Sequence, residues 1–116
     1  MKFVALVTII PQESEEKAIE VAKKAGAGAV TIFNARNIGL KEKKIFFNLT
    51  LEESMSALLF LLPRKVSLKV LKALKDEMDI DNTENSSIIF TLPIEHIFGI
   101  NREELHMFEN EIKSIL

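Results

Sequence analysis

The stretch FVALVTIIP, residues 3–11, and the stretch MSALLFLLP, residues 55–63, decide the fold. Each is a run of mostly apolar residues that ends at a proline. Runs of this length bounded by a turn residue are typical of buried β-strands. Because both runs are apolar along nearly their whole length, they predict the two central strands of a sheet that is covered on both faces.

The same order of elements follows each run. After Pro11, apolar residues at helical spacing predict a helix from about Ser14 to Ala25, ended by Gly26 and Gly28. A strand from about Ala29 to Arg36 follows, in which apolar and polar residues alternate.

After Pro63, a second helical pattern runs from about Val66 to Met78. A polar loop then leads to a strand at Ile88–Leu92, closed by Pro93. Two βαβ units side by side form the split βαβ arrangement. We therefore predict one α+β domain over residues 1–116, with the ferredoxin-like βαββαβ fold and an antiparallel four-stranded sheet.

Helices of this fold lie on one face of the sheet, so the opposite face needs separate cover. Residues 101–116 predict an additional C-terminal amphipathic helix, because Asn101 and Glu104 form a capping-box pattern. One face of this helix is apolar and carries Leu105, Phe108, Ile112 and Ile115. We expect the C-terminal helix, a second subunit or both to cover the open face.

Composition excludes several classes of protein. The chain has 116 residues, no cysteine and a formal net charge of −2. Disulfide scaffolds, thiolate metal sites and cysteine nucleophiles are therefore absent. The net charge argues against bulk attraction to nucleic acid or anionic lipid. No apolar stretch approaches the roughly 18 residues of a membrane span, so we expect a cytoplasmic protein with no direct membrane insertion.

The segment between the two halves, Asn37–Glu53, is long for a connection within a compact domain, where about 4–6 residues are usual. It carries Lys41, Lys43 and Lys44, followed by the apolar pair Ile45 and Phe46. A segment of this length and composition indicates a functional part, which either continues as a β-ribbon or docks on a neighbour.

Three stretches resemble the PII signal-transduction family in order and spacing. They are Phe3–Pro11, the turn AGAGAVT at residues 25–31, and SIIFTLPIE at residues 87–95. The resemblance covers the halves 2–37 and 55–100. It implies a homotrimer with effector sites in the clefts between subunits. It also implies that Asn37–Glu53 is a T-loop, which would report effector binding to a membrane transporter or a metabolic enzyme.

The resemblance assigns two groups of site residues and no catalytic residue. The effector-binding group comprises Arg36, Asn37, Ile38, Gly39, Asn85, Ser86, Ser87 and Arg102. The partner-docking group comprises Lys41, Lys43, Lys44, Ile45 and Phe46.

The sequence departs from the family pattern where phosphates would bind. The loop 81–88 has no glycine, and Gly99 and Asn101 stand where the family has arginines. The chain also has no tyrosine, so the uridylylation site of the T-loop is missing. These departures favour an adenine nucleotide less charged than ATP, or no nucleotide. No cofactor is required.

Other functions fit the sequence less well. The turn Pro11-Gln12-Glu13-Ser14 carries an acid where an acylphosphatase needs a phosphate cradle, and no catalytic triad is visible, so we predict no enzyme. RNA binding would need aromatic residues on the central strands. His96 and His106 stand without a second ligand motif, so no metal site is predicted.

One alternative to a PII-like protein remains open. An ACT-like or CutA-like regulatory module, which binds a small molecule or a metal, shares the topology.

Five cations along the second helix are interpreted as the solvated side of an amphipathic helix: Arg64, Lys65, Lys69, Lys72 and Lys75.

Overall fold

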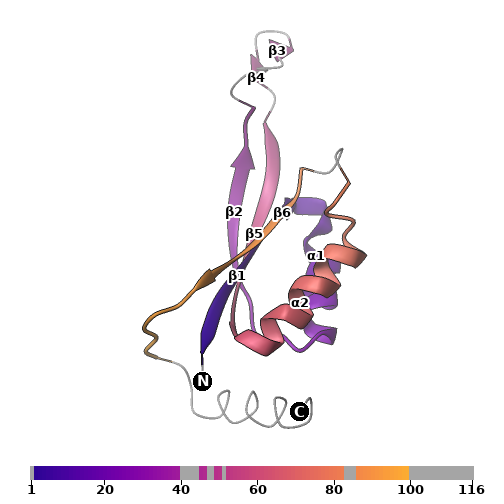
Figure 1. Ribbon diagram of the computed structural model, residues 1–116. Helices are drawn as coiled ribbons and strands as arrows, with labels where there is room; N and C mark the ends of the chain where they lie inside the picture. Colours follow the sequence, from indigo (N-terminus) through magenta and orange to yellow (C-terminus); the bar gives the residue numbers. More distant parts are fainter. Residues whose placement is uncertain (1, 40–44, 47–48, 51, 83–85, 100–116) are drawn as a thin grey trace.

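The computed structural model describes residues 2–39, 45–46, 49–50, 52–82 and 86–99. Figure 1 shows the sheet with α1 and α2 together on one of its faces. The elements follow in this order: β1 (Phe3–Pro11), a short 3-10 helix η1 (Gln12–Ser14), α1 (Glu15–Lys24), β2 (Thr31–Asn37), β3 (Ile45–Phe46), β4 (Leu49–Thr50), β5 (Glu53–Pro63), α2 (Arg64–Glu77) and β6 (Ile88–Pro93). The predicted ferredoxin-like α+β fold is confirmed, with β3 and β4 inserted between its halves.

The main sheet has four antiparallel strands in the order β2-β5-β1-β6. β1 and β5 hold the two central positions, as their apolar sequences predict. They pair over the full length of β1, from Phe3 opposite Pro63 to Pro11 opposite Met55. The two shorter and more exposed strands, β2 and β6, form the edges.

Helix α1 ends as the sequence predicts. Gly26 has a φ of 118°, which a residue with a side chain rarely adopts. The Ala27 N–H donates to the Ala22 carbonyl at 3.0 Å, and the Gly26 N–H donates to the Lys23 carbonyl at 3.1 Å. These two bonds form a Schellman motif, which satisfies the last carbonyls of the helix.

Helix α2 begins two residues earlier than predicted, at Arg64 directly after Pro63. The Arg64 N–H donates to the carbonyl of Lys2 at 3.0 Å, so the first amide of the helix has a partner outside it. Proline before the first helical residue has the extended backbone suited to this position, with φ −56° and ψ 145°.

The core lies between the sheet and the two helices. Alternate residues of the central strands face the helices, and their side chains are almost fully buried. This set comprises Leu6 and Ile10 of β1, Leu58, Phe60 and Leu62 of β5, Ala18, Val21 and Ala22 of α1, and Val66, Val70 and Leu74 of α2. The Thr8 hydroxyl also faces the core and has no hydrogen-bond partner among the described residues.

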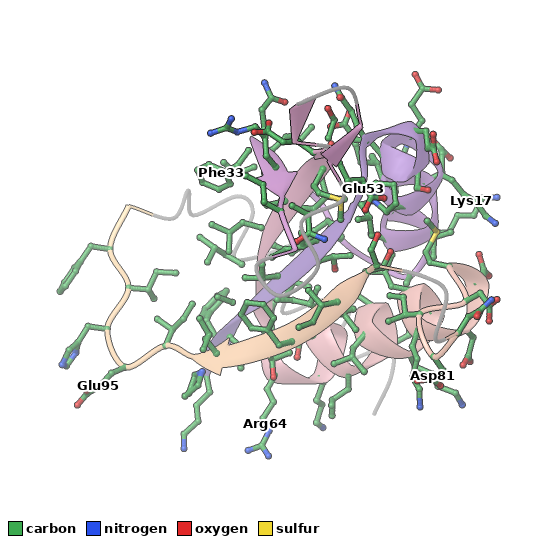
Figure 2. The ribbon with its side chains drawn as sticks, turned by 90° about the horizontal axis from the view of Figure 1, so that it is seen from above. Lys17, Phe33, Glu53, Arg64, Asp81 and Glu95 are labelled. Atoms are coloured by element: carbon green, nitrogen blue, oxygen red, sulfur yellow. The ribbon has the colours of Figure 1, made fainter. Side chains whose placement is uncertain are left out.

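The opposite face of the sheet carries large exposed apolar side chains. Phe33 is 53% exposed, Ile88 52% and Leu92 51%. Figure 2 shows Phe33 on the side of the sheet away from α1 and α2. Large apolar side chains that are exposed on one face are typical of an interaction site. The predicted C-terminal helix, residues 101–116, lies outside the described residues, so the cover of this face stays a prediction.

The mid-chain segment Asn37–Glu53 contains paired strands. β5 begins two residues earlier than predicted, because Asn37 pairs with Glu53 at the end of β2. Further along, Ile45 pairs with Thr50 and Phe46 with Leu49 to form the β3-β4 hairpin. Figure 1 places this hairpin beyond the ends of β2 and β5, away from both helices. The described part of the segment therefore forms a β-ribbon.

Candidate functional site

Arg36 lies near the end of β2, at the base of the mid-chain segment. Its Nη1 atom is 3.1 Å from Oε2 of Glu52 and 3.3 Å from Oε1 of the same residue. Since Glu52 directly precedes β5, this ion pair joins the two strands that lead into and out of the segment. The Arg36 side chain is 70% exposed and that of Glu52 is 37% exposed. The guanidinium is thus held in position but remains open to a dissolved anion.

A hollow of about 660 Å³ lies beside Arg36. Its lining combines polar and apolar side chains from η1, from β2 and the residues after it, and from the start of β5. The lining residues are Gln12, Asn34, Ala35, Arg36, Ile38, Ser54 and Met55. Amide and hydroxyl groups around a single cation, with apolar surface next to them, suit a small ligand that carries an anionic group.

The loop before β6 reaches the same end of the sheet. The Ser86 hydroxyl donates to Oε1 of Glu53 at 3.0 Å. Glu53 follows Glu52, so neighbouring carboxylates contact Ser86 on one side and Arg36 on the other. Arg36 and Ser86, which are about 50 residues apart in the chain, are therefore both bonded to side chains at the start of β5.

The charge around Arg36 is mostly negative. Glu13, Glu52 and Glu53 line a second hollow, of about 520 Å³, which shares Gln12 and Ser54 with the first. A ligand with several negative charges would be repelled by these carboxylates, since like charges a few ångströms apart repel strongly near a protein surface. This site therefore suits a ligand of low charge better than a triphosphate.

The other predicted site residues have different positions. Asn37 is the last residue of β2 and is exposed, Ile38 is half-buried, and Gly39 is exposed. Ser87 is half-buried and directly precedes β6. Ile45 and Phe46 form β3. The remaining predicted residues, Asn85, Arg102, Lys41, Lys43 and Lys44, lie outside the described residues.

Sequence reasoning missed the acidic partners in this region. Glu52 and Glu53 are adjacent in the sequence, but their relation to Arg36 depends on the register of β2 and β5. That register could not be read from the sequence, because the connection between the two strands is long and lacks a recognisable tight turn. Gln12 lines the hollow only because β1 is long enough to reach this end of the sheet.

Within the described residues there is no group of three or more acidic or histidine side chains arranged to hold a metal ion. His96 is exposed, and His106 lies outside the described residues. None of the described helices is long and apolar enough to cross a membrane.

Solved structures share this architecture, although no protein-family model and no curated protein matches the sequence. A putative PII-like signalling protein from Thermus thermophilus aligns over 81% of this chain and 87% of its own, with 18% identity and a TM-score of 0.61. CPII, a nitrogen regulatory PII-like protein from Thiomonas intermedia bound to ADP, AMP and bicarbonate, aligns over 86% and 98%, with 15% identity and a TM-score of 0.63.

The chain has the PII-like fold. The predicted resemblance to PII proteins is therefore confirmed at the level of structure. CutA1 from Pyrococcus horikoshii also aligns, over 93% of this chain and 96% of its own, with 15% identity and a TM-score of 0.63. At these identities the likeness concerns the fold, and function has to be argued from the site.

Proposed function

We propose that the chain is a non-enzymatic regulatory protein of the cytoplasm that works as a homotrimer. In this proposal a small effector binds in clefts between subunits, next to Arg36. Effector binding then changes the affinity of the mid-chain segment for a partner, which is a membrane transporter or a metabolic enzyme. The observation that carries the proposal is the position of Arg36, which lines a hollow and forms an ion pair across the base of that segment.

The open face of the sheet supports the trimer. It carries Phe33, Ile88 and Leu92 at half exposure, together with Leu61 and Phe90. Burial of apolar surface stabilises association by roughly 25 cal/mol per Å² removed from water. Contact with further copies of the chain would bury this face and would place effector sites at the subunit boundaries.

The composition of the site supports an effector that is less charged than ATP. Glu52 and Glu53 stand close to Arg36 and Ser86, and residues 81–88 have no glycine to wrap around a phosphate chain. CPII, which has the same fold, is described as bound to ADP, AMP and bicarbonate. We therefore propose AMP, ADP or bicarbonate as effectors in preference to ATP.

The partner-docking role rests on the β3-β4 hairpin. The hairpin lies beyond the main sheet, within reach of a partner protein (Figure 1). In the proposal Lys41, Lys43 and Lys44 attract an acidic partner surface, while Ile45 and Phe46 supply an apolar anchor. A deletion of residues 40–46 should abolish capture of the partner and should leave the effector affinity within about twofold, since the main sheet is untouched. Unchanged capture would contradict this role.

A CutA-like metal-binding module is the second candidate, favoured by the high coverage of CutA1. The two candidates differ in their ligand. A thermal-shift titration with AMP, ADP, ATP, cyclic nucleotides, S-adenosylmethionine, bicarbonate and divalent metals separates them. Stabilisation by an adenine nucleotide or bicarbonate that is lost in Arg36→Ala supports the proposal. Stabilisation by metal alone, lost in His96→Ala or His106→Ala, supports the metal-binding module.

A further inference from the structure

The outer face of α2 is a cationic surface. Arg64, Lys65, Lys69 and Lys72 are all exposed. Within the described part of the chain none of these four has a carboxylate at ion-pair distance, whereas Lys75 approaches Asp81 at 3.6 Å. We call Arg64, Lys65, Lys69 and Lys72 the α2 cationic surface. Figure 2 shows the Arg64 side chain pointing away from the body of the molecule.

Two of these cations oppose the electrostatics of their own helix. Arg64 and Lys65 occupy the first turn of α2, which contains no acidic residue. The amino end of a helix carries partial positive charge, so cations there are unfavourable. Helix α1 has the favourable distribution, with acids at Glu15 and Glu16 and bases at Lys23 and Lys24. A local arrangement that opposes folding in one helix and not in its neighbour indicates a role outside folding.

Leu68 lies in the middle of this surface and is 59% exposed. It is three residues after Lys65, directly before Lys69 and four residues before Lys72, so these lysines surround it on the helix. The buried face of α2 consists of Val66, Ser67, Val70 and Leu74, on the opposite side. Leu68 therefore contributes nothing to the core, and it adds an apolar contact at the centre of a ring of cations.

We propose that the α2 cationic surface docks on the anionic surface of a lipid bilayer. Lysine is a flexible point charge that suits a diffuse layer of headgroups, whereas a fixed carboxylate or phosphate site favours the planar fork of arginine. Three of the four cations are lysines. The outer face of α2 is exposed and can lie on a bilayer. Leu68 would then enter the boundary between headgroups and acyl chains while the lysines contact the headgroups.

This inference revises the expectation drawn from the net charge of −2. Overall charge governs long-range attraction, but at physiological ionic strength charges interact only over about 8 Å. Over that range the α2 cationic surface acts independently of the carboxylates at the far end of the sheet, and Asp76, one turn after Lys72, is the acidic residue of α2 nearest to it. The surface also lies on the opposite side of the sheet from the open apolar face, so the proposal is independent of the proposed trimer and its effector.

The test is sedimentation of the full-length protein with vesicles. We expect binding to vesicles of phosphatidylcholine with about 30% phosphatidylglycerol at low salt, and loss of binding at about 0.5 M salt, because the attraction is electrostatic. Vesicles of pure phosphatidylcholine should not bind. Equal binding to both vesicles, or none to either, would overturn the proposal.

Two triple variants locate the binding surface. Lys65→Gln/Lys69→Gln/Lys72→Gln should weaken binding by about 100-fold, since each cation near an anionic surface contributes roughly fivefold. Lys17→Gln/Lys23→Gln/Lys24→Gln removes the same charge from exposed positions of α1, beside Glu16 and Glu20, and should change binding less than about fivefold. Equal losses in both triples would show a net-charge effect and would overturn the proposal. Binding of RNA to the same surface, without binding of vesicles, would also overturn the proposal.

Discussion

Replacement of Glu52 by glutamine should raise the affinity of the protein for an anionic effector. In the folded chain the Glu52 carboxylate forms an ion pair with the Arg36 guanidinium at 3.1 Å, so a dissolved anion has to compete with Glu52 for Arg36. Glutamine keeps the size and polarity of the side chain but removes its negative charge. Arg36 then becomes available to the ligand.

The size of the effect follows from exposure. Because the two side chains are 70% and 37% exposed, the ion pair belongs to the weak class of surface pairs, worth about 0.2–1 kcal/mol. Removal of the competing carboxylate should lower the dissociation constant of the effector by about 1.4-fold to fivefold. The gain should shrink in about 0.5 M salt, where charges at the surface are screened.

Isothermal titration with ADP and with bicarbonate measures the effect, and Glu53→Gln provides the control. Glu53 is the next residue and accepts a hydrogen bond from Ser86 rather than pairing with Arg36. Its replacement removes the same charge from the same region without releasing Arg36. In an Arg36→Ala background, where effector binding is lost, Glu52→Gln should not restore it. Equal gains from Glu52→Gln and Glu53→Gln, or a Glu52→Gln gain that persists without Arg36, would refute the competition argument.

Five further substitutions test the core, the helix end and the open face, with chemical unfolding for the first four. Thr8→Val should stabilise the protein by roughly 1 kcal/mol, because it removes a buried hydroxyl that has no partner among the described residues; a loss of stability would mean that this hydroxyl is satisfied. Leu58→Ala should cost about 2–5 kcal/mol, since the side chain is fully buried; a loss below that range would place Leu58 outside the core. Gly26→Ala should cost about 1 kcal/mol or more because of its φ of 118°, whereas Gly28→Ala, whose added methyl group meets no atom within 4 Å, should cost less; equal costs would contradict the assigned helix end. Phe90→Lys, on the open face, should turn the proposed trimer into monomers in sedimentation velocity, and an unchanged mass would place the subunit contact elsewhere.

The sequence was sufficient to predict the main sheet and the two helices. The runs that end at Pro11 and Pro63 became the central strands, because only a central strand can bury an apolar sequence on both faces. Gly26 ended α1 for the backbone reason inferred from the sequence. The central strands and the end of α1 follow from local sequence patterns, so they could be predicted without knowledge of the tertiary structure.

The candidate site was less accessible to sequence reasoning. Arg36 was selected for its place at a strand end, but its partner Glu52 depends on strand register across a long connection. The contact between Ser86 and Glu53 joins residues that are 33 positions apart, and no pattern in the sequence predicts it. The sequence alone indicates a solvated face for the lysines of α2, because their lack of ion pairs among the described residues and the exposure of Leu68 are visible only in three dimensions.

Native mass spectrometry of the full-length protein with ADP or AMP tests the central proposal most directly, because it counts subunits and bound nucleotides together. The account predicts a complex of three 13.1 kDa chains that carries up to three nucleotides and loses them in Arg36→Ala without losing the third subunit. A chain that remains monomeric, or a trimer whose nucleotide binding is unaffected by Arg36→Ala, would contradict it.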